Sequence, residues 1–405
     1  MTTFEHALEL ILHAVRPLEV EEVETHELFE RVTAEDVVAP HDLPLFQNSA
    51  MDGYAVRTED CMQGTALQFG GFIPAGAEIW PQLEEGNAIR IMTGAPIPDY
   101  ADAVIPLEET AEDPNGGIRN LLPVRKGQHI RCAGEDVQLG DTIIHSGTPI
   151  GVAEVSLLAA MGITSLRVHR KPVVSIVATG DELVPLGAPI AKGKIFDSNS
   201  LALAAAVRAS GATARILGIA KDNISSLKQK LREAVNADAL ITVAGVSVGD
   251  HDLVRESLAN LGAVESFWGV DIKPGKATAF ALLEGKPIFS LPGNPVSALI
   301  TFEELVRPAL LRMAGHRAVM RPLVTAVLQE SLSKKPGKVF FARVKLKFEK
   351  GRFLAWSSGP QETGYQKTLL NADAFAILPA DRTIFNVGEE LRVQVLPSLQ
   401  GTDAK

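Results

Sequence analysis

The stretch ITVAGVSVGDHD, from Ile241 to Asp252, decides the fold class of this chain. Together with Ala239 and Leu240 it opens as an unbroken apolar run, which predicts a buried strand. The run breaks at two glycines and continues into a helical pattern. In an α/β sheet this order builds an anion site, because backbone N–H groups and the positive end of the helix face the ligand. The simpler alternative is an ordinary turn with an aspartate as helix cap.

Strands and helices alternate on both sides of this stretch. The expected strands are 173–178, 214–220, 239–243 and 287–291, with one more before Asp271, and the expected helices are 201–209, 225–235, 253–261 and 296–313. Alternation with short links predicts a three-layer, doubly wound domain. Ligands of such sheets bind beyond the carboxyl ends of the strands, where the polar turns of this segment fall.

Segments with other sequence patterns flank this domain. Residues 4–15 predict an amphipathic helix that begins in a capping box, Thr2 to Glu5, and residues 21–38 hold a second short helical pattern. Regular turn signals from His41 to about residue 140 predict a small all-β domain. A helix is expected over 151–162, and a strand over 166–169 is expected near the N-terminal elements. The C-terminal segment predicts a β-barrel or sandwich, with strands over 323–328, 339–348, 352–356, 374–378 and 391–396.

Composition narrows the function classes. A chain of 405 residues is expected to form two to four domains. A net charge of −10 argues against a broad nucleic-acid surface. No apolar run approaches the roughly 18 residues of a membrane span, and acidic residues near the N-terminus do not fit a secretory signal. Cys61 and Cys132 are isolated and lack metal-type spacing, so the expected compartment is the cytoplasm.

Carboxylates and lysines gather at the predicted strand ends. They are Asp181, Glu182, Asp222, Asp250, Asp252, Lys273 and Lys276. The chain has no nucleophile elbow, P-loop or dinucleotide-binding glycine pattern. Carboxylates beside glycine turns suit Mg²⁺, and two lysines around a Pro-Gly turn suit a tetrahedral oxyanion. These residues therefore predict a site for a phosphate-bearing ligand and a divalent cation, although a solvated turn is the simpler explanation of the lysines.

Seven ordered motifs give the chain a specific resemblance. They are SAMDGYA (49–55), MTGAP (92–96), GED (134–136), TGDEL (179–183), GVSVG (245–249), KPGK (273–276) and LPGNPVS (291–297). In this order they resemble the molybdopterin molybdenumtransferases, that is, the bacterial MoeA proteins and the E domain of gephyrin. The resemblance extends over essentially the whole chain.

The resemblance implies a multidomain α/β plus β fold in four parts. A framing domain would comprise 1–40 with 141–170, an inserted β domain 41–140, a three-layer doubly wound molybdopterin-binding domain 171–318, and a C-terminal β-barrel 319–405. It also implies a homodimer whose site lies between the α/β and C-terminal domains of one subunit and the inserted domain of the other.

The implied reaction converts adenylylated molybdopterin and molybdate to the molybdenum cofactor, with release of AMP in a Mg²⁺-dependent step. The molybdopterin-adenylylating enzyme is a candidate partner. Catalytic roles would fall to Asp52, Thr93, Asp136, Glu182 and Asp252. Substrate contacts would come from Asp181, Ser198, Asp222, Gly245, Ser247, Gly249, Lys273, Lys276, Pro292, Pro295, Arg343 and Thr363, with Lys273, Lys276 and Arg343 holding molybdate. Mg²⁺ contacts would come from Asp181, Glu182 and Asp252.

Three positions depart from the pattern of this family. Ala244 stands where a first glycine is usual, Ala277 and Thr278 follow the KPGK turn in place of proline and a small or aromatic residue, and Glu362 adds a charge before Thr363. These departures leave a tungstate-preferring transferase and a non-catalytic, molybdopterin-binding scaffold as alternatives. A nucleotide-dependent transferase unrelated to molybdenum is a further alternative.

Overall fold

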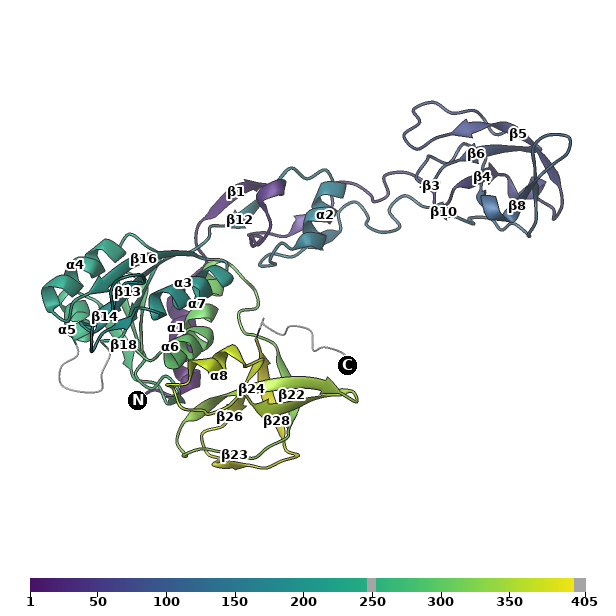
Figure 1. Cartoon of the computed structure of the whole chain (residues 1–405). Helices are drawn as coiled ribbons and strands as arrows, with labels where there is room; N and C mark the ends of the chain where they lie inside the picture. The colour runs from purple at the N-terminus through teal and green to yellow at the C-terminus, as the bar shows by residue number, and fades with distance from the viewer. Residues whose placement is uncertain (246–252, 397–405) are drawn as a thin grey trace. The chain divides into compact units, whose positions relative to one another are not determined.

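The computed structural model describes residues 1–245 and 253–396, which form two compact units. The larger unit contains Met1–Ala34, Gly147–Gly151 and Ser165–Lys405, and the smaller contains Glu35–Ser146 and Val152–Thr164. Figure 1 shows a mixed α/β protein that contains an α/β layer structure, a C-terminal barrel and a β-rich part. This confirms the predicted fold class.

A six-stranded sheet forms the centre of the larger unit. Its order is β16 (Thr213–Ala220), β13 (Val173–Thr179), β17 (Ala239–Val243), β21 (Lys286–Leu291), β20 (Ala279–Leu283) and β18 (Val264–Trp268). The first four strands are mutually parallel, and β20 runs antiparallel to both of its neighbours. The carboxyl ends of β13, β16 and β17 therefore lie at one edge of the sheet. The strand β20 was missed by the sequence analysis.

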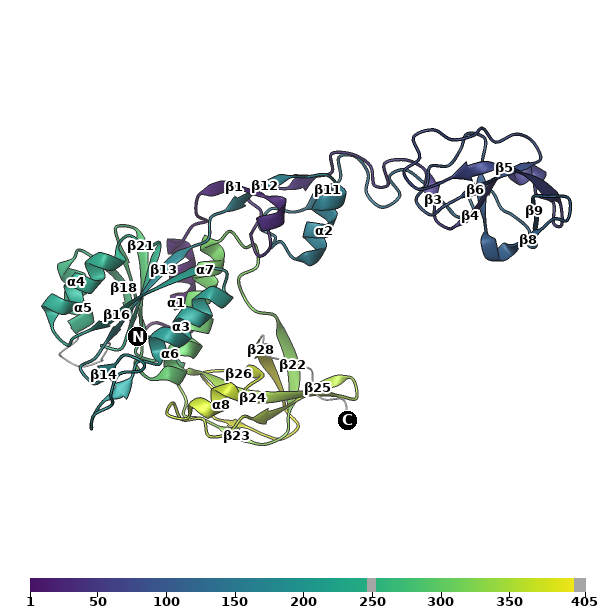
Figure 2. The ribbon, with the colours of Figure 1, turned by 45° about the horizontal axis from the view of Figure 1, so that its top comes forward.

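Helices cover both faces of this sheet, as Figures 1 and 2 show. Side chains of α1 (Phe4–Ala14), α3 (Asn199–Ala209) and α6 (Pro295–Thr301) share one hydrophobic core with β13 and β17. Side chains of α4 (Ile224–Ala234) and α5 (Leu253–Asn260) share a second core on the other face. Because β13 sends Ile176 to the first core and Val177 to the second, it is buried on both sides, as predicted for a central parallel strand.

The predicted long helix after β21 is interrupted by a π-helical turn. It consists of α6, the π-helix η4 (Phe302–Val306) and α7 (Arg307–Met313). Asn294 caps its start, since its side chain accepts a hydrogen bond of 3.3 Å from the backbone N–H of Val296. Pro295 follows at the first position, where its missing N–H is not needed.

Two N-terminal predictions are wrong. The capping residue of α1 is Thr3, whose hydroxyl accepts from the His6 backbone N–H at 3.3 Å, so the cap lies one residue after the expected Thr2, and His6 stands where a capping box would need Glu or Gln. Residues 21–38 form no α-helix; they begin with β1 (Val20–Glu24) and the 3₁₀ turn η1 (Thr25–Glu27). Antiparallel pairing of β1 with β12 (Ser165–His169) overrides the weak helical spacing and confirms the return of 166–169 to the N-terminal elements.

The C-terminal strands close into a five-stranded barrel. Its strands are β22 (Leu323–Leu328), β24 (Val339–Glu349), β25 (Arg352–Ser357), β26 (Ala374–Leu378) and β28 (Glu390–Val395). The order is β24-β25-β22-β28-β26, and β24 pairs again with β26 to complete the ring. The short strand β19 (Ile272–Lys273) extends the barrel sheet by pairing parallel with β24. The structure therefore selects the barrel over the sandwich.

The smaller unit is built on a curved half-barrel sheet. The strand order is β7 (Ala103–Pro106), β4 (Gly53–Val56), β6 (Asn87–Ile91), β5 (Ala66–Ile73), β9 (Ile118–Asn120) and β8 (Thr110–Glu112). At Gly53 an added Cβ would lie 2.1 Å from the carbonyl oxygen of Ile105, so this strand approach requires glycine. The unit also holds the strand pair β3 (Asn48–Ser49) and β10 (Ile130–Arg131), the pair β2 (Val37–Val38) and β11 (Thr142–Ile144), the 3₁₀ turns η2 (Thr58–Asp60) and η3 (Leu107–Glu109), and the helix α2 (Val152–Ala160).

The remaining short elements belong to the larger unit. They are β14 (Leu183–Val184), β15 (Ile195–Phe196), β23 (Leu332–Ser333), β27 (Ile384–Phe385) and α8 (Gln366–Leu370). Across residues 1–245 and 253–396, no helix has the length and apolar character that a membrane span requires.

Candidate functional site

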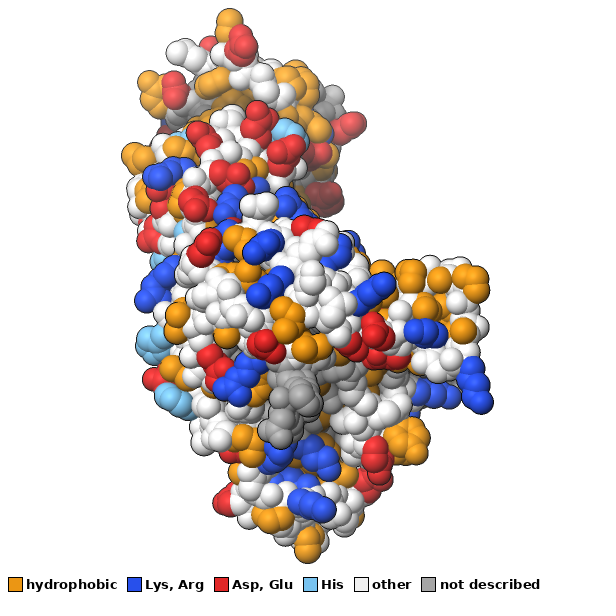
Figure 3. All heavy atoms as spheres, turned by 90° about the vertical axis from the view of Figure 1, so that its left-hand side faces the viewer, with side chains coloured by type: hydrophobic (Ala, Val, Ile, Leu, Met, Phe, Trp, Pro, Cys, Tyr) orange, Lys and Arg blue, Asp and Glu red, His pale blue; other side chains and the backbone are white. Residues whose placement is uncertain are grey.

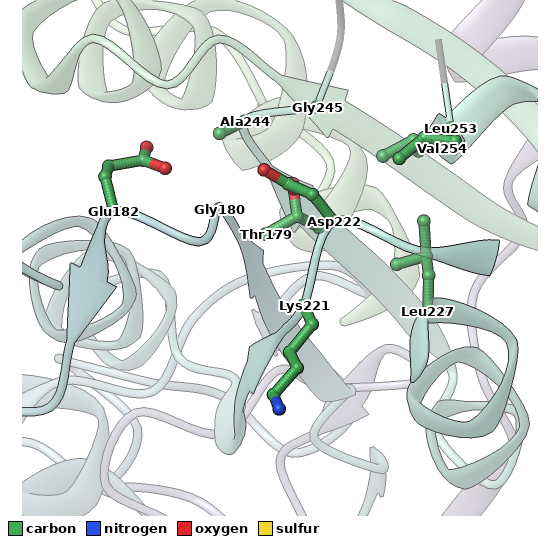
Figure 4. A pocket seen from close by; sticks show the side chains of 10 residues that line it. All are labelled: Thr179, Gly180, Glu182, Lys221, Asp222, Leu227, Ala244, Gly245, Leu253 and Val254. Atoms are coloured by element: carbon green, nitrogen blue, oxygen red, sulfur yellow. The ribbon is translucent and has the colours of Figure 1, made fainter. Parts of the chain in front are cut away.

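A pocket opens at the carboxyl ends of β13, β16 and β17, at the edge where the sequence predicted a ligand site. Its volume is about 280 Å³. The lining residues are Thr179, Gly180, Glu182, Lys221, Asp222, Leu227, Ala244, Gly245, Leu253 and Val254. Figure 4 shows the Asp222 carboxylate beside Thr179, whereas the Lys221 side chain extends away from it. The pocket therefore has a carboxylate side and an apolar side formed by the leucines and Val254.

On the carboxylate side, the turns that carry Asp181 and Asp222 are joined by reciprocal hydrogen bonds. The Asp181 backbone N–H donates to the Asp222 carboxylate at 3.2 Å, and the Asp222 backbone N–H donates to the Asp181 carboxylate at 3.2 Å. Lys194 fixes the first turn further, because its ammonium group donates to the carbonyl oxygen of Asp181. The pocket-lining Glu182 is exposed on the same turn. The structure thus brings Asp181, Glu182 and Asp222 together, as predicted.

Gly245 is required where β17 leaves the sheet. Its φ is +68°, and an added Cβ would lie 2.6 Å from the hydroxyl oxygen of Thr179 and 2.7 Å from a methyl carbon of Val254. The Thr179 hydroxyl is buried and has no hydrogen-bond partner in the described part of the chain. A side chain at position 245 would therefore collide with this polar group, which the sequence analysis did not single out.

Ala244 adopts the backbone conformation that explains why a glycine is usual there. Its φ is +67°, in the left-handed region that costs an alanine about 1 kcal/mol. Its N–H donates to the Leu291 carbonyl at 3.1 Å, which ties the residue after β17 to the last residue of β21. A Cβ on Gly293 would lie 2.9 Å from the Ala244 methyl carbon. Glycine at 293 therefore makes room for the alanine at 244.

The loop before α6 meets the start of α3. Asn199 donates from its amide to the Gly293 carbonyl oxygen at 2.7 Å. Ser198, a predicted substrate contact, is exposed and its hydroxyl makes no capping bond to α3. Pro292 is buried and Pro295 is half-buried at the first position of α6. These contacts place 198 and 292–295 in one region of the larger unit.

The predicted lysine pair lies on a well-supported turn at the barrel. Lys273 and Lys276 are exposed, and the Lys273 ammonium lies 5.2 Å from the ring centroid of Phe340. The Thr278 hydroxyl donates to the Gly275 carbonyl at 2.7 Å. A Cβ on Gly275 would lie 2.5 Å from the hydroxyl oxygen of Thr301 in α6. Thr278, a departure from the family pattern, therefore stabilises the turn.

Arg343 lies on the outer face of the barrel strand β24, because its neighbours Ala342 and Val344 face the barrel core, and it is buried beneath the loop 357–363. Its side chain is 1 % exposed, and the guanidinium donates to the carbonyl oxygens of Pro360 at 3.2 Å and Glu362 at 3.4 Å. Burial lowers its pKa, and the negative charge of Glu362 opposes this effect. Arg343 thus holds the loop that carries half-buried Thr363, and a molybdate contact of its own stays a prediction.

In the smaller unit, Asp52 and Thr93 form one hydrogen-bonded group. The Asp52 carboxylate accepts from the Thr93 backbone N–H at 2.8 Å and from its hydroxyl at 2.7 Å. These bonds, the backbone one foremost, hold the pKa of Asp52 below its ordinary value. Asp136 is exposed on the loop after β10, which pairs with β3. Asp52 is therefore an oriented, ionised carboxylate on this unit.

The Mg²⁺ site at Asp181, Glu182 and Asp252 stays a prediction. Ser247, Gly249 and Asp252 lie outside the described residues. Within 1–245 and 253–396, no three Asp, Glu, His or Cys side chains are grouped closely enough to hold a metal ion. However, Mg²⁺ commonly takes one or two protein carboxylates and completes its shell with phosphates and water. Glu182 and Asp222, both lining the pocket, fit that mode.

Family models match the chain along most of its length. The MoeA N-terminal region (domain I and II) matches residues 2–162, a probable molybdopterin binding domain matches 175–312, and the MoeA C-terminal region (domain IV) matches 325–396.

Known proteins match the chain as a whole. It is 37% identical to molybdopterin molybdenumtransferase 2 of Mycobacterium tuberculosis, over 95% of this chain and 96% of that protein. It is 34% identical to molybdopterin molybdenumtransferase of Haemophilus influenzae, with the same coverage. Among solved structures, the molybdopterin biosynthesis MoeA protein of Pyrococcus horikoshii OT3 superposes with a TM-score of 0.83 and 30% identity, covering 98% of this chain and 100% of that one.

Proposed function

Because the chain belongs to the molybdopterin molybdenumtransferase family, and is thus a transferase of molybdenum cofactor biosynthesis, we propose that it acts on adenylylated molybdopterin. In the proposed reaction, molybdenum from molybdate is inserted into this substrate and AMP is released in a Mg²⁺-dependent step. The observation that carries the proposal is the pocket of about 280 Å³ at the strand ends, which is lined by Glu182, Asp222 and the glycine turn at Gly245.

The carboxylate side of the pocket would receive the phosphates and Mg²⁺. Asp222 and Asp181 are fixed by their reciprocal bonds, so their oxygens are oriented before a ligand arrives. Bound there, Mg²⁺ would neutralise negative charge that develops as the phosphoanhydride breaks. The buried Thr179 hydroxyl, which lacks a partner in the described residues, could donate to a ligand oxygen beside Gly245.

The lysine turn would hold molybdate. Lys273 and Lys276 project from a turn that is fixed by the Thr278 hydroxyl and packed on Thr301. Ammonium groups on a rigid turn suit a tetrahedral oxyanion because little side-chain and backbone freedom is lost on binding. Loop 357–363, held by Arg343, would contribute Thr363.

The proposal includes a homodimer in which Asp52, Thr93 and Asp136 of one subunit close the site of the other. The Asp52 carboxylate is supported for this role by its two bonds from Thr93, which fix its orientation at the surface of the smaller unit. The proposed compartment is the cytoplasm, consistent with two free cysteines, Cys61 and Cys132. The enzyme that adenylylates molybdopterin would be the partner that supplies the substrate.

Product formation at varied Mg²⁺ tests the proposal. Purified protein would be given adenylylated molybdopterin, molybdate and Mg²⁺, and metal-loaded pterin would be quantified. Asp222→Asn and Glu182→Gln should each raise the Mg²⁺ concentration needed for half-maximal rate, and Glu256→Gln, at an exposed position of α5, is the control. Unchanged Mg²⁺ dependence in both variants would remove these carboxylates from the metal site. Faster turnover with tungstate would favour the alternative metal.

A further inference from the structure

The tetrapeptide Lys-Pro-Gly-Lys occurs twice in this chain. One copy is the turn 273–276, and the other is 335–338, directly before the barrel strand β24. The second copy is not among the motifs that the sequence analysis used. Its position matters because the fold brings the two copies together.

Strand pairing joins the two copies. Lys273 in β19 pairs with Phe340 in β24, and the Val339 N–H donates to the Asp271 carbonyl at 3.1 Å. Lys338 therefore directly precedes the residues that the first copy contacts. Lys338 lies at the bend directly before β24 and is therefore next to this pairing. The Lys273 ammonium lies 5.2 Å from the Phe340 ring centroid, which brings the first copy to the start of β24.

The charges in this region are unbalanced. Lys338 is half-buried; burial lowers its pKa, the positive charges of Lys276 and Lys273 lower it further, and Asp271 acts in the opposite sense. The ammonium group of Lys338 is thus repelled by those of Lys276 and Lys273. No salt bridge to any of the three is present in residues 1–245 and 253–396. Figure 3 shows basic side chains also grouped in the lower part of one face of the molecule.

The neighbouring Lys334 has a structural role, because its ammonium group binds backbone carbonyl oxygens. Its ammonium donates to the carbonyl oxygens of Lys338 at 3.0 Å, Ala380 at 3.3 Å and Lys335 at 3.4 Å. Lys334 therefore fixes the backbone of the second copy. The Lys338 side chain has no such role, although it is less exposed than Lys335.

We propose that Lys338 is a third lysine of the oxyanion site, supplied by the C-terminal barrel beside Lys273 and Lys276. The ligand class is a tetrahedral dianion, which is molybdate in the proposed function on which this inference rests. A dianion would offset the repulsion among the three ammonium groups and would link the α/β part to the barrel. Lys338 would then be a substrate-binding residue.

Equilibrium binding of sodium molybdate to the whole protein, measured by calorimetry, tests this inference. Lys338→Met should weaken binding about tenfold, as expected for the loss of one charge-assisted contact. Lys335→Met, a change of the same kind in the same tetrapeptide, should leave binding unchanged. Lys338→Arg should restore most of the affinity, because it returns the charge. Thermal unfolding of each variant would show that the barrel is intact.

A second readout follows the lysine itself. Competitive amine labelling, quantified by mass spectrometry, should show that molybdate protects Lys338 but not Lys335. Wild-type affinity in Lys338→Met, with weakened binding in Lys276→Met, would overturn the third-lysine inference and leave the proposed function standing. Absence of molybdate binding in the wild-type protein would overturn both lysine assignments, whereas the reaction itself is judged separately by AMP release.

Discussion

Single backbone positions decide the shape of the pocket. Ala244 occupies the left-handed region, and its methyl group lies where Gly293 has no side chain. The sizes of the side chains that positions 244 and 293 can hold are therefore coupled. An alanine at 244 is tolerated because position 293 is glycine, and the turn keeps its hydrogen bond to Leu291.

Ala244→Gly should raise the free energy of unfolding by up to about 1 kcal/mol, because the strain of a left-handed alanine is removed. Gly293→Ala should destabilise the wild-type protein and do so less in the Ala244→Gly background. Chemical denaturation of the two single variants and the double variant measures this coupling. Ala191→Gly, at an exposed position without positive φ, is the control and should not stabilise. Additive effects of 244 and 293 would contradict the steric argument.

Thr278 supports the lysine turn through one buried hydroxyl. Thr278→Val keeps the shape but removes the bond to the Gly275 carbonyl, so it should cost about 1 to 3 kcal/mol of stability. Because the turn loosens, molybdate binding should weaken as well. Denaturation and calorimetry measure the two effects. Thr213→Val, at an exposed strand position, is the control. A variant as stable as wild type would show that the bond contributes nothing.

Asp52 can be tested without disturbing its turn. Asp52→Asn keeps an oxygen that accepts from Thr93 but removes the negative charge. Stability should change by less than about 1 kcal/mol, while product formation should fall at least tenfold if the charge acts in catalysis. Wild-type turnover in a folded Asp52→Asn protein would exclude a catalytic role for this carboxylate.

At the scale of elements, the π-helical turn η4 carries a buried acid. Glu304 is 1 % exposed and accepts from the Gln394 amide of β28 at 2.9 Å. Burial, aided by the neighbouring charge of Glu303, raises its pKa to about 8. The folded protein thus holds a proton on Glu304 over a pH range in which the unfolded chain has released it. This links the long helix to the barrel through a protonation equilibrium.

Stability should therefore fall as pH rises between about 4.5 and 8. In this pH range the folded state binds more protons than the unfolded state. One such group changes the free energy of unfolding by at most about 1.4 kcal/mol per pH unit. Glu304→Gln removes this titration and can keep the bond to Gln394. Unfolding free energies at several pH values should show a flatter profile for Glu304→Gln than for the wild type. Parallel profiles would contradict a raised pKa.

The sequence predicted elements well where one pattern dominates. Strands of the barrel and the parallel strands β13, β17 and β21 are apolar runs between turn signals, and all were found. β20 was missed although the two-residue turn Glu284-Gly285 that joins it to β21 is itself a hairpin signal. Residues 21–38 were misread because the pairing of β1 with β12 links segments more than 140 residues apart, which local spacing cannot reveal.

The candidate site was predictable in its parts. Turn chemistry identified Asp181, Glu182 and Asp222, and the structure brings them together. It did not reveal the lone hydroxyl of Thr179 or the approach of Lys338 to the first lysine turn, because both depend on strands that meet only in the folded chain. The burial of Arg343 was equally hidden, since an arginine in an amphipathic strand is more often exposed.

At the scale of the whole molecule, the chain divides into two units that each carry proposed site residues. If one subunit's smaller unit completes the site of the other, two inactive variants should complement each other. Asp52→Asn and Lys276→Met proteins, dissociated and reassembled together, should recover activity because mixed dimers contain one intact site. Each variant reassembled alone is the control. No recovery in mixtures that contain mixed dimers would contradict a shared site.

We propose that this chain couples molybdate use to cleavage of adenylylated molybdopterin. The most direct measurement is AMP release by the purified protein with Mg²⁺, with and without molybdate. AMP should appear only when molybdate is present, in an amount equal to that of the metal-loaded pterin. AMP release that does not depend on molybdate, or tight binding of the substrate without any release, would contradict this coupling.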